Sequence, residues 1–413
     1  MSTVVSVEEL ADLVASIFVR HGMTPENADC VAEVVAAAER DGSTSHGLLR
    51  LAGYVSTLQS GWVDGKAVPV VSDVAPGLLA TDAANGFAQP ALRASAALLR
   101  KKARTQGIAA LAIRSSHHFA ALWPDVEPFA ATGLIALAVA NGRPRMAIWG
   151  GRKKILGTNP MAFACPRPGR PPLVWDQASS MIAQGEVLLA ATRGQQLPPG
   201  ISLDAEGIPT LDPNAVLQGG SMMPFGGHKG SSIAFMIEVL AAGLTGGRFG
   251  FEDNSAAYPG AQTSNAGEVV ILIDPLHIEE SHFFERIELL LEHIAASGAE
   301  RLPSEHRYER RERALREGTP SPIRTGRSST TCWRKLNRQR AHHRNWNRGG
   351  IALGPRPDRD RLGRRCGYKI PACDSNVLVD EIRVDDADPD AAAVGRRRRA
   401  RCVLECDRSG HGG

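Results

Sequence analysis

The opening residues carry apolar side chains at the 3.6-residue spacing of an amphipathic helix. In residues 6–20 these side chains are Leu10, Leu13, Val14, Ile17 and Phe18. Ser6 and Glu9 form a capping box at the start of this helix. Thr24 followed by Pro25 predicts a second helix, with Val31, Val34 and Val35 facing inward. A third helix is predicted from about Ser45 to Leu58, so the first 60 residues form a helical layer.

Apolar runs in the middle of the chain are shorter and are bounded by Gly, Pro and Asn, the pattern of buried strands. Four such runs are residues 108–113, 133–140, 172–175 and 269–274. Helical stretches lie between them, among them residues 90–104 and 231–244. The pattern predicts an α/β core. No G-x-G-x-x-G motif occurs, so a nicotinamide cofactor must be held without the Rossmann fingerprint.

Periodic apolar faces vanish from about residue 321. Residues 321–413 contain 19 Arg and 2 Lys against 11 acidic residues, a net charge of +10. One interpretation is a disordered tail, and another is a basic arm for nucleic acid. We favour a third, in which this Arg-, Gly- and Cys-rich stretch is the product of a shifted reading frame in GC-rich DNA.

Charge and cysteine content exclude several classes of protein for the rest of the chain. Residues 1–320 carry 27 basic against 33 acidic residues, so neither nucleic acid nor membrane is an expected partner. Cys30 and Cys165 are alone in the first 331 residues, which indicates a reduced, cytoplasmic protein. Glu8, Glu9 and Asp12 interrupt the first apolar stretch, unlike a signal peptide, and no run of about 18 apolar residues predicts a membrane span.

Candidate chemistry begins at residues 41–50, DGSTSHGLLR, which combine a hydroxyl, an imidazole and a guanidinium. His46 and Arg50 are four residues apart, so on a helix they share a face. A proton donor beside a group that grips carboxylates suits an enzyme acting on a small acid at a C=O or C=N bond. The alternative is that Ser45 caps a helix and that the other two are surface residues.

The paired histidines of Ser115–Phe119 follow the strand at 108–113. Adjacent side chains on extended chain point in opposite directions, so His117 and His118 are not expected to share an ion. No metal is predicted. A loop whose backbone and His118 contact a cofactor is favoured instead.

Three further segments suit ligand binding. Gly157–Pro160 is a tight turn whose hydroxyl could bind a substrate, although a plain turn explains it as well. Phe225–Gly230 lets backbone N–H groups and Lys229 approach a phosphate, with a flexible helix lead-in as the alternative. Asp176–Ala178 ends a buried strand, where α/β folds hold ligands, and Gln184–Glu186 adds a carboxylate that could orient an imidazole.

These segments, in this order, resemble the malate/L-lactate dehydrogenase superfamily that lacks a Rossmann fold. They look most like its Δ1-piperideine-2-carboxylate/Δ1-pyrroline-2-carboxylate reductases. The closer match rests on HHFAALWPDVEPF at 117–129, LPPG at 197–200, PFGGHKGSS at 224–232 and LTGG at 244–247. The likeness covers roughly residues 5–318.

The resemblance implies a role for each matching residue. Ser45 and His46 match a Ser-His pair in which the imidazole donates a proton, Glu186 matches the carboxylate that orients it, and Arg50 matches the residue that holds the substrate carboxylate. Further substrate contacts are implied for Thr158, Gln184 and Gly185. Cofactor contacts are implied for His118, Phe119, Ala120, Ala121, Leu122, Asp176, Gln177, Ala178, His228, Lys229, Arg301 and Arg307.

Three features depart from this branch. Its members usually have His-Gly-Asp where this chain has Gln184-Gly185-Glu186, which lengthens the carboxylate arm and removes an imidazole. They tend toward Gly-Asp-Arg where this chain has Ser304-Glu305-His306, at the expected grip on a 2′-phosphate. Their chains also end soon after the match stops.

The sequence therefore predicts a helical N-terminal layer plus a non-Rossmann, mixed-sheet domain that binds NADPH, with NADH possible. The predicted division is a helical domain over 1–75, joined by 276–320, an α/β domain over 76–275 and the Arg-rich tail over 321–413. The predicted protein is a cytoplasmic homodimer that reduces cyclic imino acids to L-pipecolate or L-proline. The alternatives are a 2-hydroxy acid dehydrogenase of the malate or lactate type and an inactive product with a basic tail.

Overall fold

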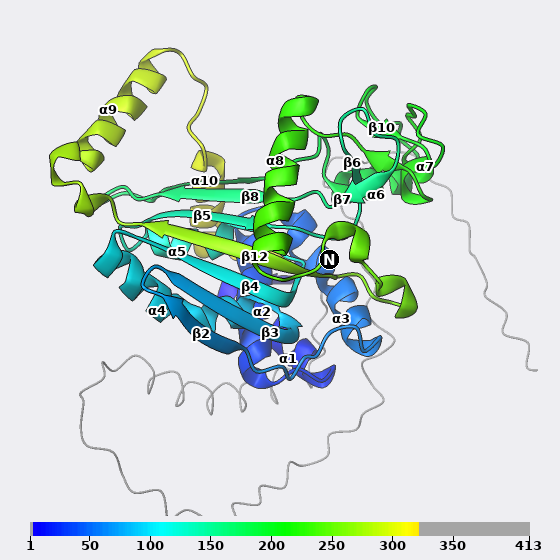
Figure 1. The fold of residues 1–413 in the computed structure, drawn as a ribbon, viewed down its shortest axis with the longest axis horizontal. Coiled ribbons are helices and arrows are strands. Elements are labelled where there is room, and N and C mark those ends of the chain that lie inside the picture. Colours follow the sequence, from blue (N-terminus) through cyan, green and yellow to red (C-terminus); the bar gives the residue numbers. More distant parts are fainter. Residues whose placement is uncertain (1–2, 322–413) are drawn as a thin grey trace, which may run out of the picture. The chain divides into compact units, whose positions relative to one another are not determined.

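The computed structural model describes residues 3–321 (Figure 1). The predictions made for residues 322–413 lie outside this range. Among the described residues, no helix is both long and apolar enough to cross a membrane.

The first two helices begin where the capping signals predicted. Helix α1 spans Val7–Arg20, and the Ser6 side chain and the Glu9 side chain bond reciprocally to each other's backbone N–H at 3.1 and 2.9 Å. Helix α2 spans Pro25–Arg40 behind an N-cap at Thr24. Within α2, Val31 and Val35 are fully buried and Val34 is half-buried.

The third helix starts later than predicted. Helix α3 spans Leu51–Gln59, and two single 3₁₀ turns, Thr44–His46 and Leu48–Arg50, precede it. The Glu39 side chain interrupts the predicted helix, because its Oε1 accepts the N–H of Leu48 at 2.6 Å. A Cβ at Gly47 would lie 2.4 Å from the same oxygen, so this approach requires glycine. The prediction that Ser45 and Arg50 belong to one helix is therefore wrong, and Ser45 caps no helix.

A seven-stranded mixed sheet forms the centre of the fold. Its strands, in order, are β2 (Val70–Ala75), β3 (Leu78–Phe87), β4 (Ile108–His118), β12 (Ser264–Ile273), β5 (Ile135–Ala140), β8 (Met161–Cys165) and β9 (Leu173–Gln177). β3 and β4 run parallel, and the other neighbours are antiparallel. The four predicted strands are confirmed, but β4 continues five residues beyond the predicted end and so includes both histidines.

Helices cover both faces of this sheet, as the predicted mixed α/β architecture requires (Figure 1). Helix α4 (Ala88–Gln106) and the short α5 (Glu127–Ala130) share the main core with Val270 and Leu272 of β12. Helix α8 (His228–Glu238), followed by a π-helical turn (Val239–Leu244), packs on Val269 and Ile271. Alternate residues of one strand thus serve opposite layers. Helix α8 begins three residues earlier than predicted.

The remaining elements surround this core. A small sheet has the order β10 (Ser202–Leu203), β11 (Ser221–Met222), β6 (Met146–Ala147) and β7 (Lys154–Leu156), and α6 (Gln184–Arg193) packs against α7 (Pro213–Leu217). Strand β1 (Thr3–Val5) pairs with β13 (Thr319–Ser321). The last helices are α9 (Phe283–Ala296) and α10 (Glu305–Glu317), and further single turns span Trp123–Asp125, Gly250–Glu252, Ser255–Ala257, Pro275–His277 and Glu279–Ser281. α10 packs against α2, as expected if residues 276–320 join the helical layer, but the division into domains stays a prediction.

Candidate active site

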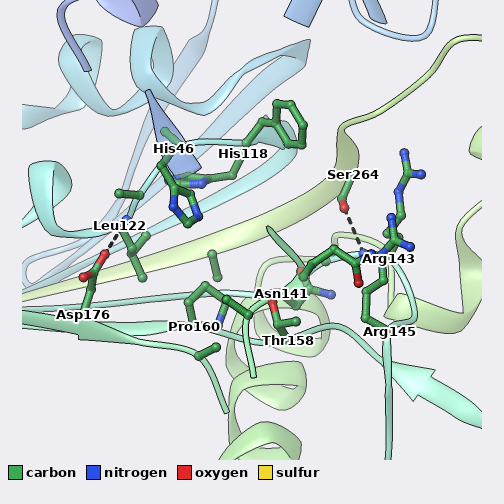
Figure 2. A pocket seen from close by; sticks show the side chains of 18 of the residues that line it. His46, His118, Leu122, Asn141, Arg143, Arg145, Thr158, Pro160, Asp176 and Ser264 are labelled. Carbon is green, nitrogen blue, oxygen red and sulfur yellow. Dashed lines mark hydrogen bonds between the residues drawn. The ribbon is translucent and has the colours of Figure 1, made fainter. Parts of the chain in front are cut away.

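A cavity of about 330 Å³ brings together residues from the helical layer and from one end of the main sheet (Figure 2). His46 and Arg50 come from the turns before α3. The stretch from His118 to Leu122 comes from the end of β4, and Asp176, Gln177 and Ala178 come from the end of β9. Thr158 and Gln184 also line the cavity. Most of the residues to which the sequence assigned substrate and cofactor contacts thus share one space.

The Ser45 hydroxyl fixes the orientation of His46, since Ser45 Oγ lies 3.0 Å from His46 Nδ1. If Ser45 donates, the neutral imidazole carries its proton on Nε2. Burial lowers the pKa of His46 to about 4, and the charges of Arg50 and His118 contribute to the shift. His46 is therefore neutral in the free cavity at pH 7.

Arg50 sits beside this pair. Its Nε donates to the carbonyl of Ser45 at 2.9 Å, and its guanidinium lies 4.3 Å from the centroid of the Phe119 ring. Stacking and one hydrogen bond hold the guanidinium in place and leave its remaining N–H groups for a ligand. Two 3₁₀ turns thus place Arg50 beside His46, as the predicted helix would have done.

Behind the cavity, His118 belongs to a buried group with Asp125 and Glu268. His118 Nε2 and Asp125 Oδ2 are 2.8 Å apart. Burial acts to lower the pKa of His118, but the hydrogen bond and charge of Asp125, with Glu268 and Asp176, raise it overall. Burial raises the pKa of Glu268 to about 8, and Asp125 adds to the shift. Glu268 is therefore largely neutral at pH 7, next to the hydrogen-bonded His118 and Asp125.

The same group offers three ligand atoms within 4.8 Å of one another, close enough for a metal ion. His118 and Asp125 are already hydrogen-bonded to each other, and burial favours the neutral form of Glu268, so the group does not offer three anionic or free ligands. That the protein needs no metal stays a prediction. His117 points away from this group and contacts Thr263 Oγ1 at 2.8 Å, as expected for neighbours on extended chain.

Asp176 is hydrogen-bonded to two other segments that are expected to bind the cofactor. Its Oδ2 accepts the N–H groups of Leu122 and Trp123 at 3.1 and 3.2 Å, and its Oδ1 lies 3.4 Å from Arg307 Nη2. Arg307 also lies over the Trp123 ring, and its Nη1 is buried with no partner among the described residues. Arg307 and Arg301 line a second cavity of about 430 Å³. An unpartnered guanidinium nitrogen beside this cavity fits a phosphate-bearing ligand.

Besides Ser45, Arg301 and Arg307, four predicted residues do not line the first cavity. Glu186 is exposed on α6, where its Oε2 accepts the N–H of Ala183 at 3.2 Å. Its neighbour Gly185 lies against the serine, since a Cβ there would be 3.4 Å from Ser45 Cβ. His228 and Lys229 are exposed at the start of α8, behind the left-handed Gly226 and Gly227.

Sequence reasoning missed the loop after β5. Asn141, Arg143 and Arg145 line the cavity, and Ser264 from β12 lies beside them (Figure 2). Two arginines in a Gly- and Pro-containing loop after a buried strand were the available signal, because such strand ends commonly hold ligands.

The chain is similar to several known proteins. The sequence model of the malate/L-lactate dehydrogenase family matches residues 5–326. The chain belongs to this family. It is 53% identical over 314 residues to the Δ1-pyrroline-2-carboxylate/Δ1-piperideine-2-carboxylate reductase of Pseudomonas syringae pv. tomato, covering 76% of this chain and 92% of that one. The crystal structure of Δ1-piperideine-2-carboxylate reductase from the same organism matches with a TM-score of 0.76 and 50% identity, over 81% of this chain and 100% of the other.

A relative with another substrate is also similar. The (2R)-3-sulfolactate dehydrogenase (NADP(+)) of Chromohalobacter salexigens is 40% identical over 314 residues, covering 76% of this chain and 93% of that protein. The predicted family and fold class are thus confirmed. The family contains enzymes that act on C=N and on C–OH substrates.

Proposed function

We propose that the protein is an NADPH-dependent reductase of cyclic 2-imino acids, forming L-pipecolate from Δ1-piperideine-2-carboxylate and L-proline from Δ1-pyrroline-2-carboxylate. The observation that carries the proposal is the Ser45–His46 hydrogen bond of 3.0 Å beside Arg50 in one cavity. The 53% identity to a reductase of these two substrates supports it.

Arg50 would bind the substrate carboxylate. Its guanidinium has free N–H groups and a fixed orientation over Phe119, and two parallel hydrogen bonds to a carboxylate would define which face of the ring is presented. Asp176 and Arg307 would help to hold NADPH, which would supply a hydride to the ring carbon next to the carboxylate. Thr158 and Gln184 would contact the rest of the ring.

His46 would give a proton to the ring nitrogen. In the free cavity the charge of Arg50 disfavours its protonated form, and burial does so more strongly. A bound carboxylate opposes the charge of Arg50, so the pKa of His46 rises when substrate binds. Ser45 keeps the ring oriented, and general acid help of this kind accelerates a reaction by roughly 10²–10⁴-fold.

Kinetics of two variants test this assignment. His46→Ala is expected to lower kcat by roughly 10²-fold or more through loss of the proton donor. Arg50→Ala is expected to raise KM by about 30-fold or more, since it removes a desolvated charge pair.

Reduction by the unaltered enzyme should be faster at pH 6 than at pH 8, because the protonated imidazole is the acid. Near-normal turnover of His46→Ala would refute the proton-donor role.

A 2-hydroxy acid substrate is the second candidate, and the 40% identity to a sulfolactate dehydrogenase favours it. In that direction a neutral His46 would accept the proton of the hydroxyl, and its lowered pKa keeps it unprotonated at neutral pH. Rates of cofactor oxidation with cyclic imines and with 2-oxo acids, at equal concentration, separate the two candidates.

The preference for NADPH is part of the proposal. Arg301, Arg307 and Arg310 line the second cavity together with Asp41 and Glu305, and the three guanidiniums suit a 2′-phosphate. NADH remains the alternative, and Kd values for the two cofactors decide between them.

The proposal also includes that the protein is a cytoplasmic homodimer. Cys30 and Cys165 are free thiols, and both are buried. On α8 and the π-helical turn, Phe235, Val239 and Leu244 are 59%, 47% and 57% exposed, an apolar surface that suits a second copy. Light scattering of the purified protein measures the oligomeric state.

A further inference from the structure

Three arginine side chains line the small cavity, Arg50, Arg143 and Arg145. No ion pair joins any of them to a carboxylate within residues 3–321. Burial lowers the pKa of all three, and for Arg145 mutual repulsion with the other two contributes to a value of about 10. Unpaired like charges in a partly desolvated space are costly, so the cavity favours anionic ligands.

Backbone groups hold Arg143 in place. Its Nη2 donates to the carbonyls of Ala261 and Thr263 at 3.1 and 2.9 Å, and its backbone N–H donates to Ser264 Oγ at 2.9 Å. Its Nε is buried without a partner among the described residues. The loop is therefore rigid, and it presents a fixed positive charge.

The backbone of Arg145 is held by hydrogen bonds, whereas its side chain has no such partner among the described residues. Its backbone N–H donates to Leu156 and its carbonyl accepts from Met222, at 2.8 and 2.9 Å. Its guanidinium makes no hydrogen bond or ion pair with residues 3–321. The charge of Asp253 raises the pKa of Arg145, but this acid accepts from Ser255 Oγ at 2.7 Å and does not line the cavity. The donors of Arg145 are therefore available to a ligand.

The three arginines are not equivalent in position. Figure 2 shows His46 with Leu122 and Asp176 on one side of the cavity, and Arg143 and Arg145 on the opposite side next to Ser264. Leu122 and Asp176, which belong to two of the expected cofactor segments, lie on the His46 side. One carboxylate beside His46 satisfies Arg50, which leaves the far side with two cations and no cavity-lining carboxylate next to them.

We propose that Arg145, set beside the rigid Arg143, binds a second anionic group of the substrate, so that the enzyme prefers 2-imino or 2-oxo acids carrying a further carboxylate or sulfonate. This inference rests on the proposed function, because it places the first carboxylate on Arg50. Gln184 adds a neutral amide to the cavity lining. A dianion also leaves less positive charge around His46, which favours the proton that this residue must donate.

Matched ligands test the proposal on the full chain. The binding probes are pyridine-2-carboxylate and pyridine-2,6-dicarboxylate, measured by calorimetry with NADPH present. The reaction probes are Δ1-piperideine-2-carboxylate and its 2,6-dicarboxylate. Unaltered protein should bind the dicarboxylate roughly 10- to 100-fold more tightly and should show a similar preference in kcat/KM.

The variant Arg145→Met keeps the length of the side chain and removes its charge. It should lose the preference for the dicarboxylate while its affinity for the monocarboxylate changes less than about threefold, and Arg145→Lys should recover part of the preference. Arg152→Met is the matched control, since this exposed arginine lies seven residues further along the chain, between β6 and β7, and does not line the cavity. It should behave like the unaltered protein.

Two outcomes would overturn the proposal. Equal weakening of both pyridine ligands by Arg145→Met would give this residue a general role in the cavity. Weaker NADPH binding with an unchanged dicarboxylate preference would assign it to a cofactor phosphate. Failure of the proposed function looks different: no imine is reduced, yet the binding preference persists and still depends on Arg145.

Discussion

Glu268 shows at the scale of a single residue how burial controls charge in this protein. Its side chain is fully buried on β12, and both carboxyl oxygens lack a hydrogen-bond partner among the described residues. Desolvation therefore dominates, and the pKa of Glu268 rises to about 8 from a usual 4.5. A neutral Glu268 adds no negative charge beside Asp125, whose hydrogen bond and charge raise the pKa of His118 at the cavity wall.

Glu268→Gln is predicted to change how stability depends on pH. Below pH 4.5 the acid is protonated in both the folded and the unfolded chain. As pH rises toward 8 only the unfolded chain loses this proton, so the folded state loses stability over that window, by at most about 1.4 kcal/mol per pH unit for one proton. The amide variant cannot ionise and should lack this loss.

Urea unfolding at pH 5, 6, 7 and 8 measures the effect. The gap in unfolding free energy between Glu268→Gln and the unaltered protein should shift in favour of the variant as pH rises. Glu206→Gln, at an exposed site, is the control and should show no such trend. A gap that stays constant from pH 5 to pH 8 would mean that Glu268 is ionised in the folded protein.

At the scale of an element, the start of α6 determines how Gln184 and Gly185 meet the site. Glu186 Oε2 accepts the N–H of Ala183 at 3.2 Å, and an acidic side chain in the first turn of a helix is favourable. Gly185 brings this turn against Ser45, since a Cβ there would be in van der Waals contact with Ser45 Cβ at 3.4 Å. The observed contact of Glu186 is therefore with its own helix, and its orienting role toward His46 stays a prediction.

Replacing Glu186 distinguishes these two roles. Glu186→Ala removes the contact at the helix start, so we expect a loss of about 0.5–1 kcal/mol in stability and a fewfold rise in KM as the turn loosens. Because the carboxylate does not contact the Ser45–His46 pair, kcat should fall less than about tenfold. Ser45→Ala, which removes the observed contact, should lower kcat more. A 10²-fold loss of kcat in Glu186→Ala would instead support an orienting carboxylate.

At the scale of the whole molecule, α10 joins the helical layer to the cofactor side of the core. Arg311 bonds to both oxygens of Asp41 at 3.0 and 2.5 Å and to both oxygens of Glu127 at 2.7 and 2.9 Å. The Asp41 side chain is completely buried at the end of α2, and Glu127 begins α5. This single guanidinium therefore connects three helices that are far apart in sequence.

Arg311→Met is predicted to destabilise the fold by about 2–4 kcal/mol, because removing one partner of a buried pair leaves charge uncompensated, although Arg40 also contacts Asp41. The midpoint of urea unfolding at pH 7 measures this loss. Arg316→Met on the same helix is the control, since its pair with Glu317 is 70% and 57% exposed and is expected to contribute little. Equal stability of the two variants would show that α10 is not held by this network.

The sequence by itself determined the features that depend on neighbouring residues. The caps at Ser6 and Thr24 and the buried strands β5 and β12 could be predicted, because a capping bond or a short apolar run lies within a few positions. The motifs around His46, His118 and Asp176 identified the family and most of the cavity lining for the same reason, since each is a short contiguous stretch.

Tertiary structure decided what depends on distant residues. The late start of α3 follows from Glu39, whose carboxylate reaches the N–H of Leu48 across a turn. The cluster of Arg50, Arg143 and Arg145 exists because a helical layer and the strand-end loop after β5 meet at the same edge of the sheet. No local pattern encodes that meeting, because it depends on the order in which β4, β12 and β5 pair. Burial, and with it the protonation of His46 and Glu268, is likewise a property of the folded chain alone.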